Sequence, residues 1–307
     1  MKKGMIEFGW IFSLIIGAII LVLALVFSRT LIQTETSKGE AELVSGLDIL
    51  LNPFTSVGGT TITLAKNITL PSNTNITFRC DQNYTIGRNI MKVISETVFG
   101  KGQGFERNIY NKYIFSPANI QEKKIFVLGK SLEMPFRVDD AIYIIDKPYC
   151  FFNAPSDVKE ELEAVSVPVK FDSCETGNRK VCFGQTGCDI NIASSDDYES
   201  GTVTKGKTVY FATRTLLYAA IFSDPDIYRC NVQRLMKRLS NVTDVYIYKA
   251  GQISARGCEL RDIEVELAAL KTASNLAGNS LNPDFAQIFE QAKTVASTNK
   301  LLECPVF

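Results

Sequence analysis

Residues 8–28 have the sequence FGWIFSLIIGAIILVLALVFS and contain no charged side chain. As an α-helix, a segment of this length rises about 31 Å, which matches a hydrocarbon core of about 30 Å. A secretory signal has a shorter apolar core, about 7–15 residues, followed by an A-x-A-like cleavage site. Val26-Phe27-Ser28 fits such a site poorly. The stretch therefore predicts a transmembrane helix over 8–28 in preference to a cleaved signal.

Basic residues flank this helix unequally. Lys2 and Lys3 precede it together with the amino terminus, and Arg29 follows it closely. Positively charged flanks tend to stay in the cytoplasm. The sequence therefore predicts a single-pass protein of the cell membrane, with residues 1–7 in the cytoplasm and the bulk of the chain outside it.

The composition of the chain excludes several classes of function. The formal net charge is zero with no basic stripe, which argues against a nucleic-acid partner. Histidine is absent, which removes Ser-His and Cys-His nucleophilic pairs and every His-ligated metal site. We therefore expect partners at the membrane: other envelope proteins, or a second copy of the chain bound through the transmembrane helix.

Two features of the helix indicate contact with other helices. Gly9, Ser13 and Gly17 recur every fourth residue and form one ridge of small side chains, which lets another helix approach closely in lipid. Glu7 lies at the head of the helix, where the helix dipole favours a carboxylate. It is a candidate assembly carboxylate, set against a plain interfacial position.

The start of the chain resembles the processed leader of archaeal type IV pilin-like proteins, through Lys3-Gly4-Met5-Ile6-Glu7-Phe8 and the apolar helix that follows. In that family a membrane peptidase cuts after the glycine, and the helices bundle into a filament core. The resemblance implies a cut after Gly4 and a role in assembly. That cut would place Glu7 third in the mature chain, whereas the family has it fifth. The whole chain also resembles uncharacterised single-pass membrane proteins of archaea.

All eight cysteines follow the proposed anchor. An even number on the exported side predicts up to four disulfides, although 105 complete pairings are open. A local bridge is expected within residues 174–188. A structural zinc site would favour C-x₂₋₄-C spacing, which does not occur, and unpaired buried thiols are the third alternative. The candidates are Cys80, Cys150, Cys174, Cys182, Cys188, Cys230, Cys258 and Cys304.

Four N-x-T patterns are candidate glycosylation acceptors on an exported surface. Three of them fall within a short stretch. The candidates are Asn67, Asn75, Asn83 and Asn241.

Periodicity predicts an α+β fold. Residues 29–53 favour a helical stalk, or an extension of the spanning helix, with Leu43, Leu47 and Leu50 on one face. Residues 54–212 alternate with period two and predict a β-rich exported region. Residues 213–307 carry stripes at helical spacing and predict a helical region that packs on it.

Three local signals sharpen this outline. Residues 132–138 alternate as one strand, with Pro135 as a mark of an edge or a bulge. Residues 156–164 predict a short helix. Asp224 and Pro225 suit the cap and the first position of a long helix.

No motif predicts catalysis, a cofactor or a metal ion. The glycine-rich stretch 99–105 matches neither nucleotide-binding pattern, and it is expected to be a loop. The acidic pairs 139–140, 196–197 and 224–226 are expected to be solvated turns, and the basic residues of 229–238 a solvated helix face. We therefore expect a non-enzymatic, membrane-anchored envelope protein that acts through protein–protein contact, in its sharpest form a pilin-like or pseudopilin-like component. The alternative is a monomeric anchored binding or sensor domain.

Overall fold

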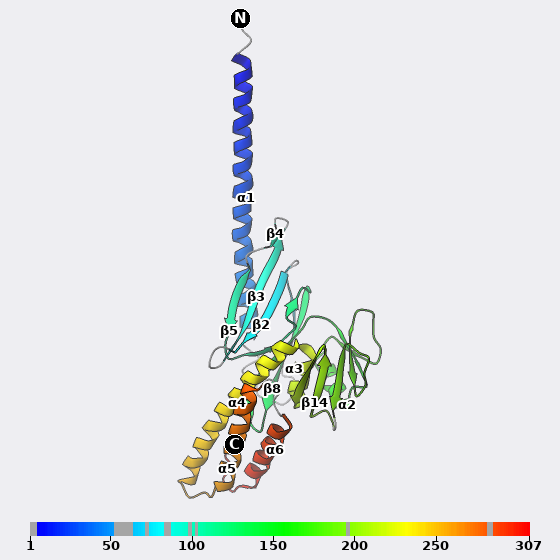
Figure 1. Cartoon of the computed structure of the whole chain (residues 1–307), viewed down its shortest axis with the longest axis vertical. Helices are drawn as coiled ribbons and strands as arrows, with labels where there is room; N and C mark the ends of the chain where they lie inside the picture. The colour runs from blue at the N-terminus through cyan, green and yellow to red at the C-terminus, as the bar shows by residue number, and fades with distance from the viewer. Residues whose placement is uncertain are drawn as a thin grey trace.

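Helix α1 (Met5–Leu51) stands out from the rest of the molecule as a single rod (Figure 1). The computed structural model describes residues 5–51, 64–70, 74–82, 87–97, 100–101, 104–194, 197–280 and 285–307. The helix runs through the predicted span and the predicted stalk, so Gly39 and Gly46 do not interrupt it. The fold is α+β as predicted, with sheets in the middle of the chain and helices at its end.

The described strands form three sheets. The four-stranded sheet has the order β1 (Leu64–Thr69), β8 (Lys124–Glu133), β9 (Arg137–Ile145) and β6 (Tyr113–Phe115). The five-stranded sheet has the order β4 (Gly100–Lys101), β3 (Arg88–Thr97), β2 (Thr74–Asp81) and β7 (Asn119–Ile120), and β5 (Phe105–Ile109) also pairs with β3. The six-stranded sheet has the order β11 (Val169–Phe171), β10 (Tyr149–Phe152), β12 (Arg179–Phe183), β13 (Ile190–Ser194), β14 (Ser200–Lys205) and β15 (Lys207–Ala212).

The four-stranded sheet is buried on both faces and separates two apolar cores. On β9, Tyr143 and Ile145 face the larger core, which contains the carboxy-terminal helices. Ile142 and Ile144 face the smaller core, which contains the five-stranded sheet and Val44 of α1. A strand with both faces covered is apolar without alternation, which is why 141–145 is a continuous apolar run.

Residues 132–138 form a hairpin, so the prediction of one strand there is wrong. Strand β8 ends at Glu133 and β9 begins at Arg137, with an irregular register after Leu132. Met134, Pro135 and Phe136 form the turn between the two strands. Pro168 directly precedes β11, which is the edge strand of its sheet.

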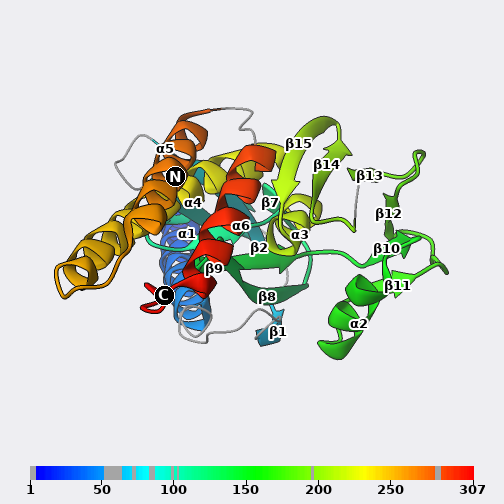
Figure 2. The ribbon, with the colours of Figure 1, turned by 90° about the horizontal axis from the view of Figure 1, so that it is seen from below.

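The helical layer follows the predicted boundaries closely. Helix α2 covers Ser156–Ala164, and α3 (Arg214–Phe222) is almost wholly buried. Helix α4 (Pro225–Ser254) begins where predicted, with the Asp224 side chain accepting a hydrogen bond from the Asp226 amide. Helices α4, α5 (Arg261–Asn279) and α6 (Phe285–Leu301) lie side by side beyond the four-stranded sheet (Figure 2). Residues 281–284, which precede α6, lie outside the described residues.

Candidate functional site

The first half of α1 is long and apolar enough to cross a bilayer. The segment Trp10–Leu31 has 22 residues and a mean hydropathy of 3.0, and none of it is buried against the rest of the chain. It is the one such helix in the described part of the chain. A buried core helix of a soluble protein would be covered by other elements, so this surface is free for lipid or for another helix.

The small residues of the predicted ridge lie on this uncovered helix. Ser13 and Gly17 are exposed, and a Cβ atom added at Gly17 would meet nothing within 4 Å. Gly9 and Glu7 belong to the same helix, but their surroundings lie outside the described side chains. The ridge thus carries no intramolecular contact at the two positions that the structure describes.

The second half of α1 docks on the five-stranded sheet, at a contact that we call the α1 seat: Glu40 and Val44 against β3 and β5. Val44 is fully buried in the smaller core, and Leu43 packs partly against that core. Glu40 is also buried, and its Oε1 accepts a hydrogen bond of 2.7 Å from the Ser95 amide of β3. The seat therefore fixes the helix to the domain through one apolar and one polar contact.

Sequence reasoning missed the two central residues of the seat. It placed an apolar face at Leu43, Leu47 and Leu50, of which the latter two fall outside the described side chains. A glutamate is almost never expected to be buried without a partner, so Glu40 gave no signal. Its spacing of four from Val44 is the one hint, because residues at that spacing share a helix face.

The eight cysteines form four disulfides, as predicted. Cys182–Cys188 is the expected local bridge, and Cys150–Cys174 closes a loop within the six-stranded sheet region. The other two bridges are long-range: Cys80–Cys230 joins β2 to α4 across 150 residues, and Cys258–Cys304 joins the ends of α5 and α6. Four bridges in one domain are typical of proteins that fold in an oxidising compartment.

The candidate glycosylation sites differ in accessibility. Asn67 lies exposed on β1, an edge strand, and Asn241 is exposed on α4. Asn75 is only partly exposed on β2, and its Oδ1 is buried without a hydrogen-bond partner. Asn83 lies outside the described residues. Glycosylation of the two exposed sites remains a prediction.

The basic residues of α4 are not all solvated, so that expectation is wrong for Arg234. Its side chain is buried, lies over the Tyr113 ring at 4.9 Å and donates to Asn231 Oδ1 at 2.7 Å. Because a buried guanidinium needs such partners, Arg234 joins α4 to the preceding strand region. The neighbouring Arg229 donates to the Thr208 carbonyl at 2.7 Å.

The acidic pair Asp139-Asp140 is partly buried between β9 and α4, and it is not the solvated turn we expected. Arg137 Nη2 lies within 2.8 Å of both Asp140 oxygens, and Arg238 Nε lies 3.5 Å from Asp139. Burial raises the pKa of both carboxyl groups, against the opposing effect of the arginines. Each carboxylate already has a cation, which gives the pair a structural role. Of the other pairs, Asp196 lies outside the described residues, whereas Asp224 caps α4.

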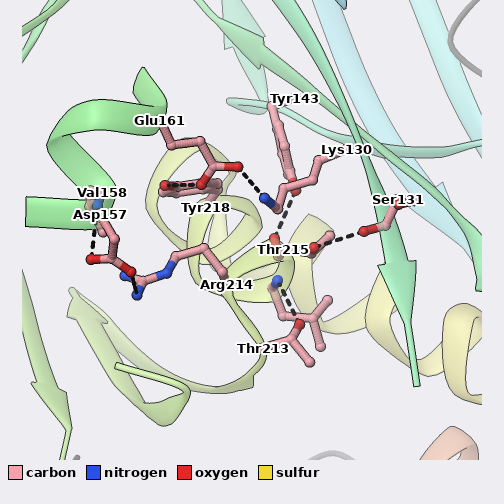
Figure 3. Close-up of polar contacts among 11 residues, drawn as sticks. Lys130, Ser131, Tyr143, Asp157, Val158, Glu161, Thr213, Arg214, Thr215 and Tyr218 are labelled. Atoms are coloured by element: carbon pink, nitrogen blue, oxygen red, sulfur yellow. Dashed lines mark hydrogen bonds and ion pairs between the residues drawn. The ribbon is translucent and has the colours of Figure 1, made fainter. Parts of the chain in front are cut away.

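A cluster of buried polar groups joins α2, α3 and β8 (Figure 3). Lys130 forms an ion pair with Glu161, which also accepts a hydrogen bond of 2.7 Å from the Tyr218 hydroxyl. Burial and the Glu161 charge raise the pKa of Tyr218. Arg214 pairs with Asp157 at the rim of an adjoining surface pocket of about 520 Å³. These charges neutralise one another, so the cluster clamps α2 onto the domain.

A larger pocket of about 730 Å³ is lined by residues of the five-stranded and six-stranded sheets, the β9–β10 connection and the start of α4. Lys205 lines it at the end of β14, and its Nζ donates to the main-chain carbonyls of Ile221 and Ser223. Arg179, at the start of β12, lines it too, and its Nη1 lies 3.1 Å from the Tyr149 hydroxyl. Desolvation and the nearby Arg179 charge lower the pKa of Lys205 to about 7, although Asp224 opposes them. This pocket has a more polar lining than the one beside α2, and sequence reasoning gave no sign of it.

The described residues contain no group of three or more Cys, Asp or Glu side chains placed to hold a metal ion. Comparisons with protein-family models, with curated proteins and with solved structures found no match. The assignment of a role therefore rests on the anchor helix, the α1 seat, the disulfides and the pocket.

Proposed function

We propose that this chain is a non-enzymatic envelope protein, anchored by the first half of α1, that acts through contact with other membrane proteins or with copies of itself. The observation that supports it most is the division of one helix. The segment Trp10–Leu31 has no intramolecular cover, while Val44 and Glu40 hold the same helix to the domain. A force or contact at the spanning half would thus be passed directly to the exported domain.

The proposed contact is helix–helix packing along Gly9, Ser13 and Gly17, and pilin-like or pseudopilin-like assembly is its sharpest form. In lipid there is no hydrophobic drive between helices, so association depends on close backbone approach at small residues. The proposed orientation has residues 1–7 in the cytoplasm of a cell-membrane protein, on the strength of Lys2 and Lys3. In the pilin-like form, processing would occur after Gly4.

The test is self-association of full-length chains in a membrane two-hybrid assay. Gly17→Leu should weaken association about tenfold, because the added side chain separates the helices. Ala18→Leu is the matched control, since it adds a similar bulk about 100° around the helix. Equal association by the wild type and Gly17→Leu would remove the helix-packing proposal.

Processing has its own test in the amino terminus of the mature protein. A first residue of Met5 would support the pilin-like form, and an intact Met1 would leave a plain anchor. The second candidate function, a monomeric anchored binding protein, is favoured by the 730 Å³ pocket. A monomer in native-membrane cross-linking, with Met1 intact, would select that function.

A further inference from the structure

The pocket of about 730 Å³ combines positive charge with unused hydrogen-bonding capacity. Its volume falls within the range of about 300–1,000 Å³ that is usual for small-molecule sites. Three cations line it: Lys147 from the β9–β10 connection, Arg179 from β12 and Lys205 from β14. They come from segments far apart in the sequence, so the fold gathers them at one place.

The two carboxylates of the same pocket each accept one main-chain hydrogen bond, and two of the three cations already have a carboxylate nearby: Lys147 lies 3.7 Å from Glu122, and Arg179 lies 3.6 Å from Asp146. Asp189 Oδ2 accepts a hydrogen bond of 2.8 Å from the Lys180 amide, and Asp224 Oδ1 accepts one of 2.9 Å from the Asp226 amide. Lys205, by contrast, donates to two uncharged carbonyl groups and forms no ion pair within the described parts of the chain. A cation taken from water without a counter-ion is costly, and an anionic ligand would supply the missing charge.

An unpartnered amide supplies an independent observation. Asn178 lines the pocket and is about nine-tenths buried, yet its Nδ2 has no hydrogen-bond partner. Behind Arg179, the buried Asp146 Oδ1 also lacks a hydrogen bond, with Arg179 Nη1 at 3.6 Å. Buried polar atoms are nearly always satisfied in folded proteins, and each exception calls for a water, an ion or a ligand group.

The rest of the lining suits a ring that bears hydroxyl groups. Asn119 and Asn178 offer amide groups, and the free lone pairs of Asp189 and Asp224 can accept from hydroxyls. Pro117, Ile190 and Pro225 add apolar surface against which a ring face can lie. A guanidinium such as that of Arg179 matches a carboxylate in shape as well as in charge.

From this juxtaposition we propose that the pocket binds a carboxylate-bearing sugar of the uronic-acid class. Arg179 and Lys205 face its carboxylate, Lys147 supplies charge at the rim, and the Asn178 amide donates to the sugar. The proposal goes beyond the anchored-assembly role and stands whether or not the helices associate.

The experiment is calorimetric titration of the full-length protein with glucuronate, glucose and acetate, in a detergent without a sugar headgroup. Glucuronate should bind saturably, and glucose and acetate about tenfold more weakly, since each lacks half of the recognised chemistry. Absence of saturable glucuronate binding would overturn the proposal. If glucose bound as tightly as glucuronate, the proposed recognition of the carboxylate would be wrong. If acetate bound as tightly as glucuronate, the proposed recognition of the sugar would be wrong.

Two variants test the assignment to this pocket. Asn178→Leu should weaken glucuronate binding about tenfold without lowering thermal stability, because it removes a donor that has no partner in the protein. Lys147→Glu should also weaken binding, whereas Lys249→Glu, an equal charge change on the exposed face of α4, should not. Wild-type affinity in Asn178→Leu, or an equal loss in Lys249→Glu, would place any binding elsewhere.

Discussion

The two halves of α1 share one unbroken helix but have opposite environments. Trp10–Leu31 is strongly apolar, with a mean hydropathy of 3.0, and none of it is buried against the rest of the chain. Further along, Val44 and Glu40 are buried against β3 and β5, while Lys38 and Glu42 of the same half are exposed. One continuous helix can therefore have two different environments. A uniform apolar surface suits lipid, whereas a single narrow apolar face suits docking on a sheet.

The largest expected change in unfolding free energy comes from removing the disulfide that holds the sheet on which the second half of α1 docks. Cys80–Cys230 ties the sheet that carries the α1 seat to α4, and it closes a loop of 150 residues. In the chain-entropy description, removing it with Cys80→Ser and Cys230→Ser should cost about 5 kcal/mol of unfolding free energy. Urea denaturation of the full-length protein in detergent measures this.

The matched control is the pair Cys182→Ser and Cys188→Ser, which opens a loop of 6 residues. The same relation gives about 2 kcal/mol for that bridge. An equal or larger loss in the control would mean that the long bridge does not secure the sheet beneath the helix.

Replacement of one apolar residue in each half compares the halves directly. Val44→Ala should lower the unfolding free energy of the domain by about 2 kcal/mol, because it leaves a cavity in the smaller core. Leu23→Ala, on the uncovered half, should leave that free energy unchanged. Similar losses in the two variants would show that the first half of α1 also packs on the domain.

The smallest effect is expected at the polar contact of the seat. Glu40→Gln keeps an acceptor for the Ser95 amide but removes its charge, which should cost about 1 kcal/mol. Hydrogen exchange at Ser95 should accelerate accordingly, whereas Glu42→Gln, an exposed neighbour, should leave it unchanged. If the Ser95 amide exchanged at the same rate in Glu40→Gln as in the wild type, its hydrogen bond to Glu40 would not stabilise the α1 seat.

The elements that depend on a few neighbouring residues could be predicted from the sequence. An uncharged run predicted the apolar first half of α1, and the pair Asp224-Pro225 predicted the start of α4, because a capping side chain and a fixed φ act within one turn. The hairpin around Pro135 was missed because alternation is the same on both arms of a hairpin and along one strand.

The remaining features depend on partners that are distant in the sequence. Burial of Arg234 requires the Tyr113 ring, and the Glu40 contact requires the Ser95 amide. Disulfide pairing could not be chosen among 105 alternatives without the fold. The pocket was invisible for the same reason, since Lys147, Arg179 and Lys205 are brought together only by the folded six-stranded sheet and the β9–β10 connection.

The central claim is that the first half of α1 holds the chain in a membrane while the domain folds in an oxidising compartment. The most direct measurement is thiol alkylation of the full-length protein in alkali-washed membranes, read as a mass shift before and after reduction. The account predicts that the protein stays in the membrane pellet, with no thiol labelled before reduction and all 8 cysteines labelled afterwards. Protein recovered in the soluble fraction, with its thiols labelled before reduction, would contradict it.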